Sequence, residues 1–310
     1  MSEFETIQSL LGRRAELRSR LALLPYEGTP EIKRLSSGRY LYVRKRVLNK
    51  VTSTYVGPYS DELFNLLLRN NEERKLLSKQ LRGVEKELAR LGYEEADLSP
   101  KVVLNLEYAR SNMKRIIYDQ AVLEGIGTTF PDTETIIENG KVSNATAEDV
   151  QKILNLKHAW EFVLDKDVLA APSNYYLACY IAKLVNEGFY REGGRIRYVP
   201  VTIGGTSYVP PLPLESEVRR AIDAIAQGDG AKEDIAIELL LYVMKTQIYN
   251  DGNKRTALIF ANHYMISNGL GLLIIPFDKV GEFKKMLVAY YEGRDEGATR
   301  SFLKSCINKL

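Results

Sequence analysis

Apolar side chains recur every three or four residues along most of the chain, which predicts a mainly helical protein. Thr146 followed by Asp149 is a helix-start signal, in which Asp stands for the usual Glu or Gln of a capping box. The polar stretch over 125–140 is expected to be a loop. The predicted helices span about 61–92, 101–124, 146–163, 173–187, 215–227, 232–248, 253–267 and 278–291, with a further short helix after them.

Two segments alternate in the manner of strands and predict β-hairpins. Residues 39–47 and 51–56 are rich in β-branched and aromatic side chains and form the first predicted hairpin. In the second, 196–203 and 206–209 flank Gly204-Gly205, which suits the positive φ angles of a tight turn. Pro200 and Pro210 cannot donate to a ladder, so this second hairpin is expected to be an edge or an isolated ribbon.

The long helix over 61–92 has a short heptad seam. Docking of this helix within the protein and contact with a second copy in a homodimer both fit the pattern. Gly92 and Ser99-Pro100 mark a boundary, which predicts a basic N-terminal region over 1–95 and a helical domain over 96–310. The seam consists of Leu77, Leu81, Val84, Leu88 and Leu91.

Composition indicates a soluble, cytoplasmic protein with a packed core, because 45% of residues are hydrophobic and 27% are charged. The longest apolar stretch, 270–277, is far too short to span a membrane, and the N-terminus lacks the features of a signal peptide. Two Cys residues far apart in sequence are expected to be reduced thiols. Two His and two Cys make a zinc site a poor expectation, and His158 and His263 are expected to be helix-packing residues.

The charge is uneven along the chain. Residues 1–60 hold eleven Lys and Arg against five Glu, a net charge of +6, whereas the other 250 residues sum to −3. On the first hairpin the alternation places Tyr40, Tyr42, Arg44 and Arg46 on one face. Basic residues interleaved with Tyr can contact nucleic acid. A solvated hairpin face is the favoured alternative, because the patch is small and the pI is only 8.6.

The segment 246–258, Thr-Gln-Ile-Tyr-Asn-Asp-Gly-Asn-Lys-Arg-Thr-Ala-Leu, predicts a tight loop that opens into a helix N-terminus. The free N–H groups and the dipole of such a terminus favour an anion. Lys254 and Arg255 fall in the first turn, where the dipole disfavours cations unless an anion is bound. Asp251 could hold a Mg²⁺ ion that bridges phosphates. An ordinary helix–turn–helix with a solvated loop remains the alternative.

This segment resembles the signature of the Fic/Doc family, His-x-Phe-x-Asp/Glu-Gly-Asn-Gly/Lys-Arg-x-x-Arg. Tyr249 stands for the aromatic residue, and residues 254–258, Lys-Arg-Thr-Ala-Leu, are more similar to the Doc branch than to the adenylyltransferase branch. Residues 194–211 resemble the family's flap hairpin, and Ile137-Glu138-Asn139 resembles the core of its inhibitory segment. The resemblance covers about 100–295. It implies a mainly α fold, a Fic-type helical core with a β-hairpin flap, preceded here by the N-terminal hairpin and long helix. The residues that match the signature are Asp251, Gly252, Asn253 and Arg255.

The family resemblance implies transfer of AMP from ATP to a protein hydroxyl, or phosphoryl transfer as in the Doc branch. Asp251 would hold Mg²⁺, and the flap would dock a protein substrate, for which strand addition is a suitable mode. The sequence does not identify that protein. By this resemblance the nucleotide-binding residues are Asp251, Gly252, Asn253, Lys254 and Arg255, the docking residues are Ile203, Gly204, Gly205 and Thr206, and the inhibitory candidates are Glu138 and Asn139.

Three positions depart from the family pattern. Gln247 replaces the catalytic His, and an amide cannot accept the proton of a hydroxyl nucleophile, so a loss of about 10²–10⁴ in rate is expected. Leu258 replaces the final Arg, the expected partner of Glu138, and Glu134 occupies the Ser/Thr position of the inhibitory segment. Two functions therefore stay open. One is a weakened or atypical ATP-dependent transferase. The other is an inactive nucleotide- or protein-binding module, regulatory or associated with nucleic acid as in an autoregulating toxin–antitoxin locus.

Overall fold

The computed structural model describes residues 3–47, 50–93, 97–138, 140, 142 and 145–309. The chain divides into two compact units, Met1–Glu95 and Ala96–Leu310, which are described separately.

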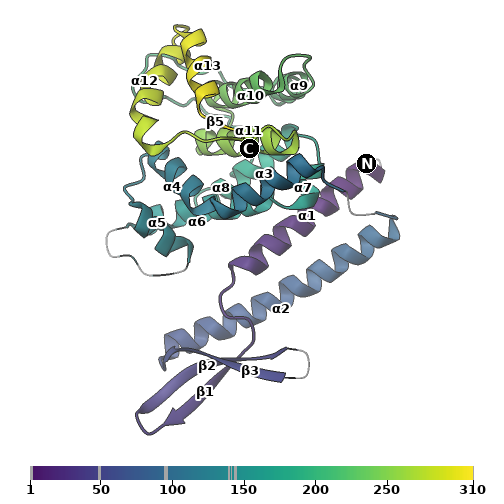
Figure 1. Cartoon of the computed structure of the whole chain (residues 1–310), viewed down its shortest axis with the longest axis vertical. Helices are drawn as coiled ribbons and strands as arrows, with labels where there is room; N and C mark the ends of the chain where they lie inside the picture. The colour runs from purple at the N-terminus through teal and green to yellow at the C-terminus, as the bar shows by residue number, and fades with distance from the viewer. Residues whose placement is uncertain are drawn as a thin grey trace. The chain divides into compact units, whose positions relative to one another are not determined.

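The first unit is built from two helices and a three-stranded antiparallel sheet with the order β1-β2-β3 (Figure 1). Leu41 and Val43 point from β2 to one face of the sheet, where they are buried against Leu67 of α2. The structure confirms the hairpin predicted over 39–56 and adds a strand and a helix that the sequence pattern did not predict. The elements are α1 (Glu3–Leu23), β1 (Thr29–Leu35), β2 (Gly38–Val47), β3 (Lys50–Pro58) and α2 (Asp61–Arg90).

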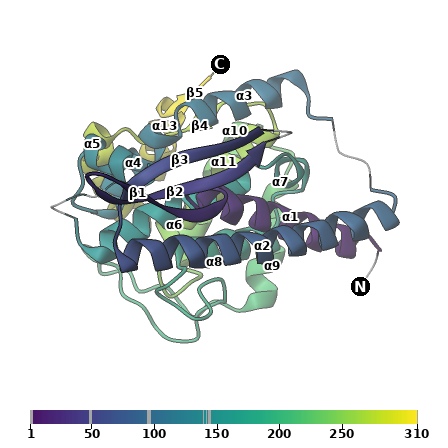
Figure 2. The ribbon, with the colours of Figure 1, turned by 90° about the horizontal axis from the view of Figure 1, so that it is seen from below.

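Helices α1 and α2 run side by side in opposite directions, as Figures 1 and 2 show. Arg74 of α2 donates to the carbonyl of Leu21 at 3.3 Å and also to the carbonyl of Leu24. The Arg14 guanidinium lies 5.4 Å from the ring centroid of Tyr93. The long predicted helix is therefore docked within its own unit, one of the two arrangements that its seam allowed.

The second unit is a helical bundle arranged around α11 (Figure 1). Thirteen of the fifteen residues of α11 are buried, so this helix is enclosed on all sides, by α3, α4, α6, α7, α8 and α10 among others. The helices are α3 (Pro100–Ser111), α4 (Met113–Glu124), α5 (Phe130–Ile137), α6 (Ala147–Val163), α7 (Lys166–Ala170), α8 (Tyr175–Val185), α9 (Glu215–Ala226), α10 (Lys232–Thr246), α11 (Asn253–Ser267), α12 (Val280–Tyr291) and α13 (Glu296–Ser305). Short pieces complete it, namely β4 (Leu272–Leu273), the 3₁₀ turn η1 (Phe277–Lys279) and β5 (Ile307–Asn308).

Two predictions of secondary structure in this unit were wrong. The helix predicted over 101–124 is interrupted at Asn112, which ends α3 and begins α4. The loop predicted over 125–140 contains α5, which is capped by the hydroxyl of Thr129 accepting from the N–H of Asp132 at 3.3 Å. The predicted start of α6 is confirmed, since Thr146 accepts from the N–H of Asp149 at 3.1 Å.

The second predicted hairpin was also wrong. Residues 196–209 are all described and contain no strand, only a turn at Gly204-Gly205. Pro200 and Pro210 have no N–H to donate, and the buried guanidinium of Arg197 occupies carbonyls that a ladder would need. We call residues 194–211 the flap segment.

Within the part of the chain that the structure describes, no helix combines the length and the apolar character needed to cross a bilayer.

Candidate functional site

The loop between α10 and α11 is shaped by two residues in the left-handed region. Gln247 ends α10 at φ 48° and ψ 62°, and Gly252 precedes α11 at φ 73°. A Cβ on Gly252 would lie 2.9 Å from Oδ1 of Asn186 and 3.1 Å from Cγ2 of Val185. Glycine is thus required at 252 by both backbone angle and space.

Asn253 holds this loop closed through its side chain. Its Oδ1 accepts from the N–H of Tyr249 at 2.9 Å, and its Nδ2 donates to the carbonyl of Tyr249 at 2.8 Å and to Oε1 of Gln247 at 3.1 Å. Both ends of the amide are engaged inside the protein. Of the groups at Asn253, the backbone N–H is therefore the one suited to an anion.

The first turn of α11 fits an anion. Its N-cap is Gly252, and no side chain caps the helix. The N–H groups of an α-helix's first turn have no intrahelical partner, so here they lack an acceptor from a capping residue. Lys254 contributes a cation that is 32% exposed. Backbone donors, dipole and ammonium group together could hold a phosphate group.

Arg255 is not placed to be a free phosphate ligand. Its side chain is 1% exposed, and its Nη2 donates to Oδ2 of Asp251 at 2.8 Å. Its Nη1 donates to the carbonyl of Val185 at 3.0 Å, and its Nε lies 3.4 Å from Oε2 of Glu124. Two carboxylates and a carbonyl therefore surround this buried cation. A phosphate could reach Arg255 only by displacing one of them.

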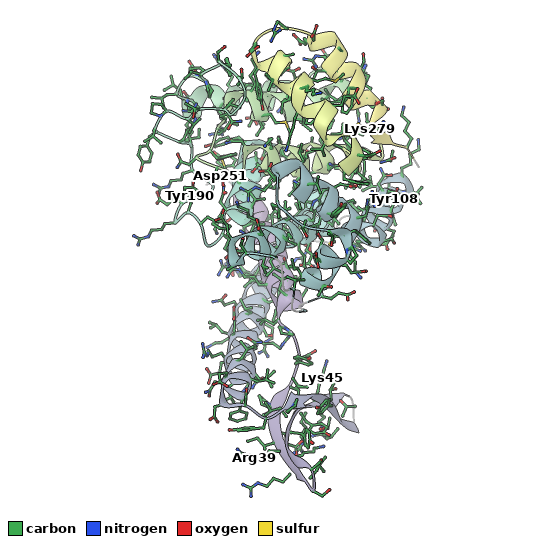
Figure 3. All side chains as sticks on the ribbon, turned by 90° about the vertical axis from the view of Figure 1, so that its left-hand side faces the viewer. Arg39, Lys45, Tyr108, Tyr190, Asp251 and Lys279 are labelled. Carbon is green, nitrogen blue, oxygen red and sulfur yellow. The ribbon has the colours of Figure 1, made fainter. Side chains whose placement is uncertain are left out.

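Asp251 remains accessible, as its side chain is 44% exposed although one oxygen accepts from Arg255 (Figure 3). Nδ2 of Asn186 donates to the Asp251 carbonyl at 2.9 Å and fixes the backbone. Among the described residues, no group of three or more His, Cys, Asp or Glu could by itself hold a metal ion. A single carboxylate nevertheless fits Mg²⁺, which commonly uses one or two protein carboxylates together with phosphates and water.

Gln247 carries no titratable group, and its amide is used to hold the loop. Nε2 donates to the carbonyl of Met244 at 2.6 Å, while Oε1 accepts from Asn253. The neighbouring Tyr249 is fully buried, its hydroxyl lies 3.7 Å from Sγ of Cys179, and burial raises its pKa well above the usual value. Tyr249 is therefore protonated at neutral pH and is no substitute base.

The two histidines are packing residues, as the sequence predicts. Nδ1 of His158 lies 3.2 Å from Oε2 of Glu187. His263 lies in the core, with its Nδ1 2.7 Å from the Ser173 hydroxyl and its Nε2 2.7 Å from the Val168 carbonyl. Burial lowers the pKa of His263 to about 4. This imidazole is neutral, so Nε2 donates to the carbonyl and Nδ1 accepts from the hydroxyl.

The flap segment is tied to α12 and α10. The Thr206 hydroxyl donates to Oε1 of Glu292 at 2.9 Å. The ring of Tyr208 stacks on Tyr291 with centroids 6.2 Å apart, and the Lys245 ammonium lies 5.7 Å from the Tyr208 centroid. The predicted docking residues are all in this loop. Ile203 and Thr206 are half-buried, and Gly204 and Gly205 are exposed.

Arg197 joins the flap segment to the loop at 247, and sequence reasoning missed it. Its guanidinium is 1% exposed and donates to four backbone carbonyls, those of Gln247 at 2.5 Å, Val199 at 2.9 Å, Pro210 at 3.2 Å and Pro211 at 2.5 Å. Burial lowers its pKa. Nothing in the local sequence distinguishes Arg197 from the exposed Arg195.

Two residues of α4 that sequence reasoning also missed support the start of α11. Nε2 of Gln120 donates to the Arg255 carbonyl at 2.9 Å, and its Oε1 accepts from Nε1 of Trp160 at 2.9 Å. Glu124, one turn later, is 12% exposed and faces both Arg255 and Lys254, the latter at 3.7 Å. The available signal was this pair of polar residues four apart on an otherwise apolar helix face.

The inhibitory candidates lie away from these contacts. Glu138 forms an exposed ion pair with Lys114, and Asn139 lies outside the described residues. Leu258, at the position of the final signature Arg, is a core residue with 5% exposure. The carboxylate beside the signature arginine is thus Glu124 rather than Glu138.

Residues 172–265 match the profile of the Fic/DOC family. The chain carries a Fic/DOC family domain. The matched range includes the 247–255 loop, the flap segment and most of the central helix α11. Residues 4–65 match a domain of unknown function, DUF6788. No curated protein matched the chain.

Solved structures with the Fic fold resemble the chain at low identity. Fic-1 (residues 134–508) from C. elegans is 17% identical, with a TM-score of 0.54 over 76% of this chain and 72% of that one. A Fic domain containing signaling protein from Bacteroides thetaiotaomicron is 15% identical, with a TM-score of 0.53 over 67% and 87%. A Fic family protein from Desulfovibrio desulfuricans is 15% identical, with a TM-score of 0.52 over 69% and 74%. These likenesses show a common fold.

Proposed function

We propose that the Fic domain binds ATP–Mg²⁺ at the start of α11 and transfers a nucleotidyl or phosphoryl group to a protein hydroxyl at a weakened rate. The observation that carries this proposal is the uncapped first turn of α11 between Lys254 and the exposed Asp251. Backbone donors, one cation and one accessible carboxylate form a setting for a phosphate group and its metal ion.

In this mechanism each residue has a limited task. Asp251 would hold Mg²⁺, which when bound neutralises phosphate charge. Lys254 and the first-turn N–H groups stabilise the charge on the phosphate oxygens. Asn253 and Arg255 act indirectly, because their side chains hold the loop that positions Asp251, Lys254 and the first-turn N–H groups. Gln247 leaves the attacking hydroxyl without a general base.

Calorimetric titration of ATP–Mg²⁺ tests the binding step. Lys254→Ala and Asp251→Asn are expected to weaken the affinity about tenfold each. The first removes a cation that faces the phosphates, the second removes the carboxylate that would hold Mg²⁺, and a charge-assisted contact is worth about 1.5–3 kcal/mol. Glu134→Gln, which breaks an exposed ion pair with Lys114, is the matched control and should leave the affinity unchanged. Binding that none of these variants alters, or no binding at all, contradicts the proposed site.

Self-labelling and labelling of added protein with α- or γ-labelled ATP test transfer. Gln247→His is expected to raise labelling about 100-fold or more, the typical contribution of a general base. Gln247→Asn keeps an amide and suits the left-handed backbone, so it should give no gain. The label position distinguishes AMP from phosphoryl transfer. Strong wild-type labelling that Gln247→Asn and Gln247→His leave unchanged would show that the base lies elsewhere.

The second candidate is a binding module without transfer, and the buried contacts of Arg255 favour it. The Arg255 side chain is 1% exposed and lies between two carboxylates, so it is poorly placed to stabilise a phosphate group during transfer. This function predicts ATP affinity sensitive to Lys254→Ala but no label from either nucleotide position, in the wild type or in Gln247→His.

A further inference from the structure

The three-stranded sheet of the first unit has one face turned away from α2. Leu41 and Val43 of β2 point toward α2. Side chains alternate along a strand, so those at the even positions of β2, from Tyr40 to Arg46, point the other way. The strand register places Tyr55 of β3 opposite Tyr42, and Lys33 of β1 opposite Tyr40. We call this surface the outer face, and it consists of Glu31, Lys33, Tyr40, Tyr42, Arg44, Arg46 and Tyr55.

The outer face is positively charged, and its two arginines are open to solvent. Arg44 and Arg46 are exposed, and neither forms an ion pair with any residue that the structure describes. Residues 27–58 contain seven Lys and Arg against two Glu, Glu27 and Glu31. Glu27 forms an ion pair with Lys45.

A basic groove adjoins the sheet where β2 ends. It has a volume of about 340 Å³ and lies between the end of β2, the residues before β1 and α2. Arg74 is committed to the carbonyls of Leu21 and Leu24, but Lys75 and Arg82 are exposed and have no carboxylate partner among the described residues. The cationic lining consists of Arg44, Lys45, Arg46, Arg74, Lys75 and Arg82, with Glu27 as its acidic member.

The aromatic packing indicates which nucleic acid fits. The Tyr55 ring meets Tyr42 edge-on at 5.4 Å and Tyr40 at 6.1 Å, and the Lys33 ammonium covers Tyr42 at 4.3 Å. Tyr40 and Tyr42 are half-buried, and of the three rings Tyr55 alone is exposed, at 51%, whereas single strands bind by stacking successive bases on open ring faces. A ribbon of two strands fits the major groove of B-DNA, about 12 Å wide, but not the deep and narrow one of A-form RNA.

We propose that the outer face binds double-stranded DNA, with the β2–β3 ribbon against the major groove. Arg44 and Arg46 at one end of the ribbon, together with Lys75 and Arg82 of the adjoining groove, contact the phosphates. The tyrosines lie against the base edges. The charge, the shape of the surface and the lack of carboxylate partners for these four cations among the residues that the structure describes all match a polyanion of this form.

Fluorescence anisotropy of the full chain with labelled duplex DNA of about 20 base pairs, two helical turns, tests the proposal. Arg44→Ser/Arg46→Ser and Lys75→Ala/Arg82→Ala are each expected to weaken binding about tenfold or more at about 50 mM salt. Each pair should also lower the slope of log affinity against log salt by about 2, one per lost phosphate contact. All four side chains are exposed, so circular dichroism should show an unchanged fold.

The matched control removes the same charge elsewhere. Lys284→Ala/Lys285→Ala takes two exposed cations from α12 and should change the affinity less than twofold. Unlabelled duplex should compete better than single-stranded DNA or double-stranded RNA of the same length. No binding of the wild type, an equal loss in the α12 control, or preferential competition by single strands or RNA would each overturn the proposal.

Discussion

At the scale of the single residue, the buried Arg255 depends on carboxylates from two sides. Asp251 precedes it on the same loop, and Glu124 reaches it from α4. A buried cation that loses a partner has an uncompensated desolvation cost, which is why breaking such a pair typically costs several kcal/mol. Here Asp251 would remain, so the cost of losing Glu124 should be smaller.

We therefore expect Glu124→Gln to lower the free energy of unfolding by about 1–3 kcal/mol, because Arg255 would lose charge compensation in a buried setting. Glu134→Gln breaks an exposed pair with Lys114 and should cost less than about 1 kcal/mol. Urea unfolding followed by circular dichroism measures both. Equal effects of the two variants would mean that Glu124 contributes no more than a surface charge.

His263 predicts a pH dependence of stability at acidic pH. Its pKa is lowered to about 4 in the folded protein, while the unfolded value is about 6.5. Between these values the unfolded chain binds a proton that the native core rejects, so stability falls as pH drops from about 6.5 to 4 and the effect then levels off. From pH 7 to pH 5 this group alone should remove about 2 kcal/mol.

Comparison with His263→Gln isolates this effect, because carboxylates also titrate in the acidic range. Gln can donate to the Val168 carbonyl and accept from Ser173, the two contacts that His263 makes. The variant should lose about 2 kcal/mol less than the wild type over the same pH interval, as measured by urea unfolding at each pH. Parallel pH profiles would show that His263 does not titrate as described.

At the scale of the element, Arg197 determines the conformation of the flap segment. One guanidinium holds both ends of this loop and the carbonyl of Gln247, in place of a strand ladder. Arg197→Met should leave these carbonyls without donors and expose 199–211 to proteolysis, with a loss of about 2–3 kcal/mol in stability. Limited proteolysis read by mass spectrometry checks this.

Arg195→Met serves as the control for the flap, since the Arg195 side chain is 76% exposed and forms an exposed ion pair with Glu192. Its cleavage pattern should match that of the wild type. If Arg197→Met is cleaved no faster than this control, then the loop conformation rests on the Thr206–Glu292 and Tyr208–Tyr291 contacts instead.

Much of the helical architecture could be predicted from sequence because its signals are local. Thr146 and Asp149 predicted the start of α6, and the same Thr-x-x-Asp signal at Thr129 and Asp132 would have predicted α5. The 247–255 loop was likewise visible as a turn followed by a helix. The signals that failed were those that depend on distant partners.

The flap and the surroundings of Arg255 show why the rest could not be predicted. Alternation and a Gly-Gly turn favoured a hairpin over 196–209, but tertiary contacts of Arg197 with carbonyls on both sides decided the backbone. Arg255 was predicted to face a phosphate from its place in the loop. The burial and the Glu124 contact that engage it come from a helix more than one hundred residues earlier.

At the scale of the whole molecule, charge is divided between the two units. Residues 1–95 contain eighteen Lys and Arg against thirteen Asp and Glu, whereas the rest of the chain holds 25 against 27. The DNA-binding proposal draws on the first unit and the nucleotide proposal on the second, with no residue in common. Effects of changes at sites that share no partner are expected to add rather than to interact.

The two binding activities should therefore be separable in one protein. Arg44→Ser/Arg46→Ser should lose DNA affinity and keep its ATP–Mg²⁺ affinity within about twofold, while Asp251→Asn should do the reverse, because neither change alters a charge at the other site. Anisotropy and calorimetry on the same preparations measure both affinities for each variant. The variant that carries all three substitutions should show both losses, each of the size measured in the separate variants. A DNA affinity that responds to Asp251→Asn, or an ATP affinity that responds to the arginine pair, would indicate coupling between the units that separate sites do not predict.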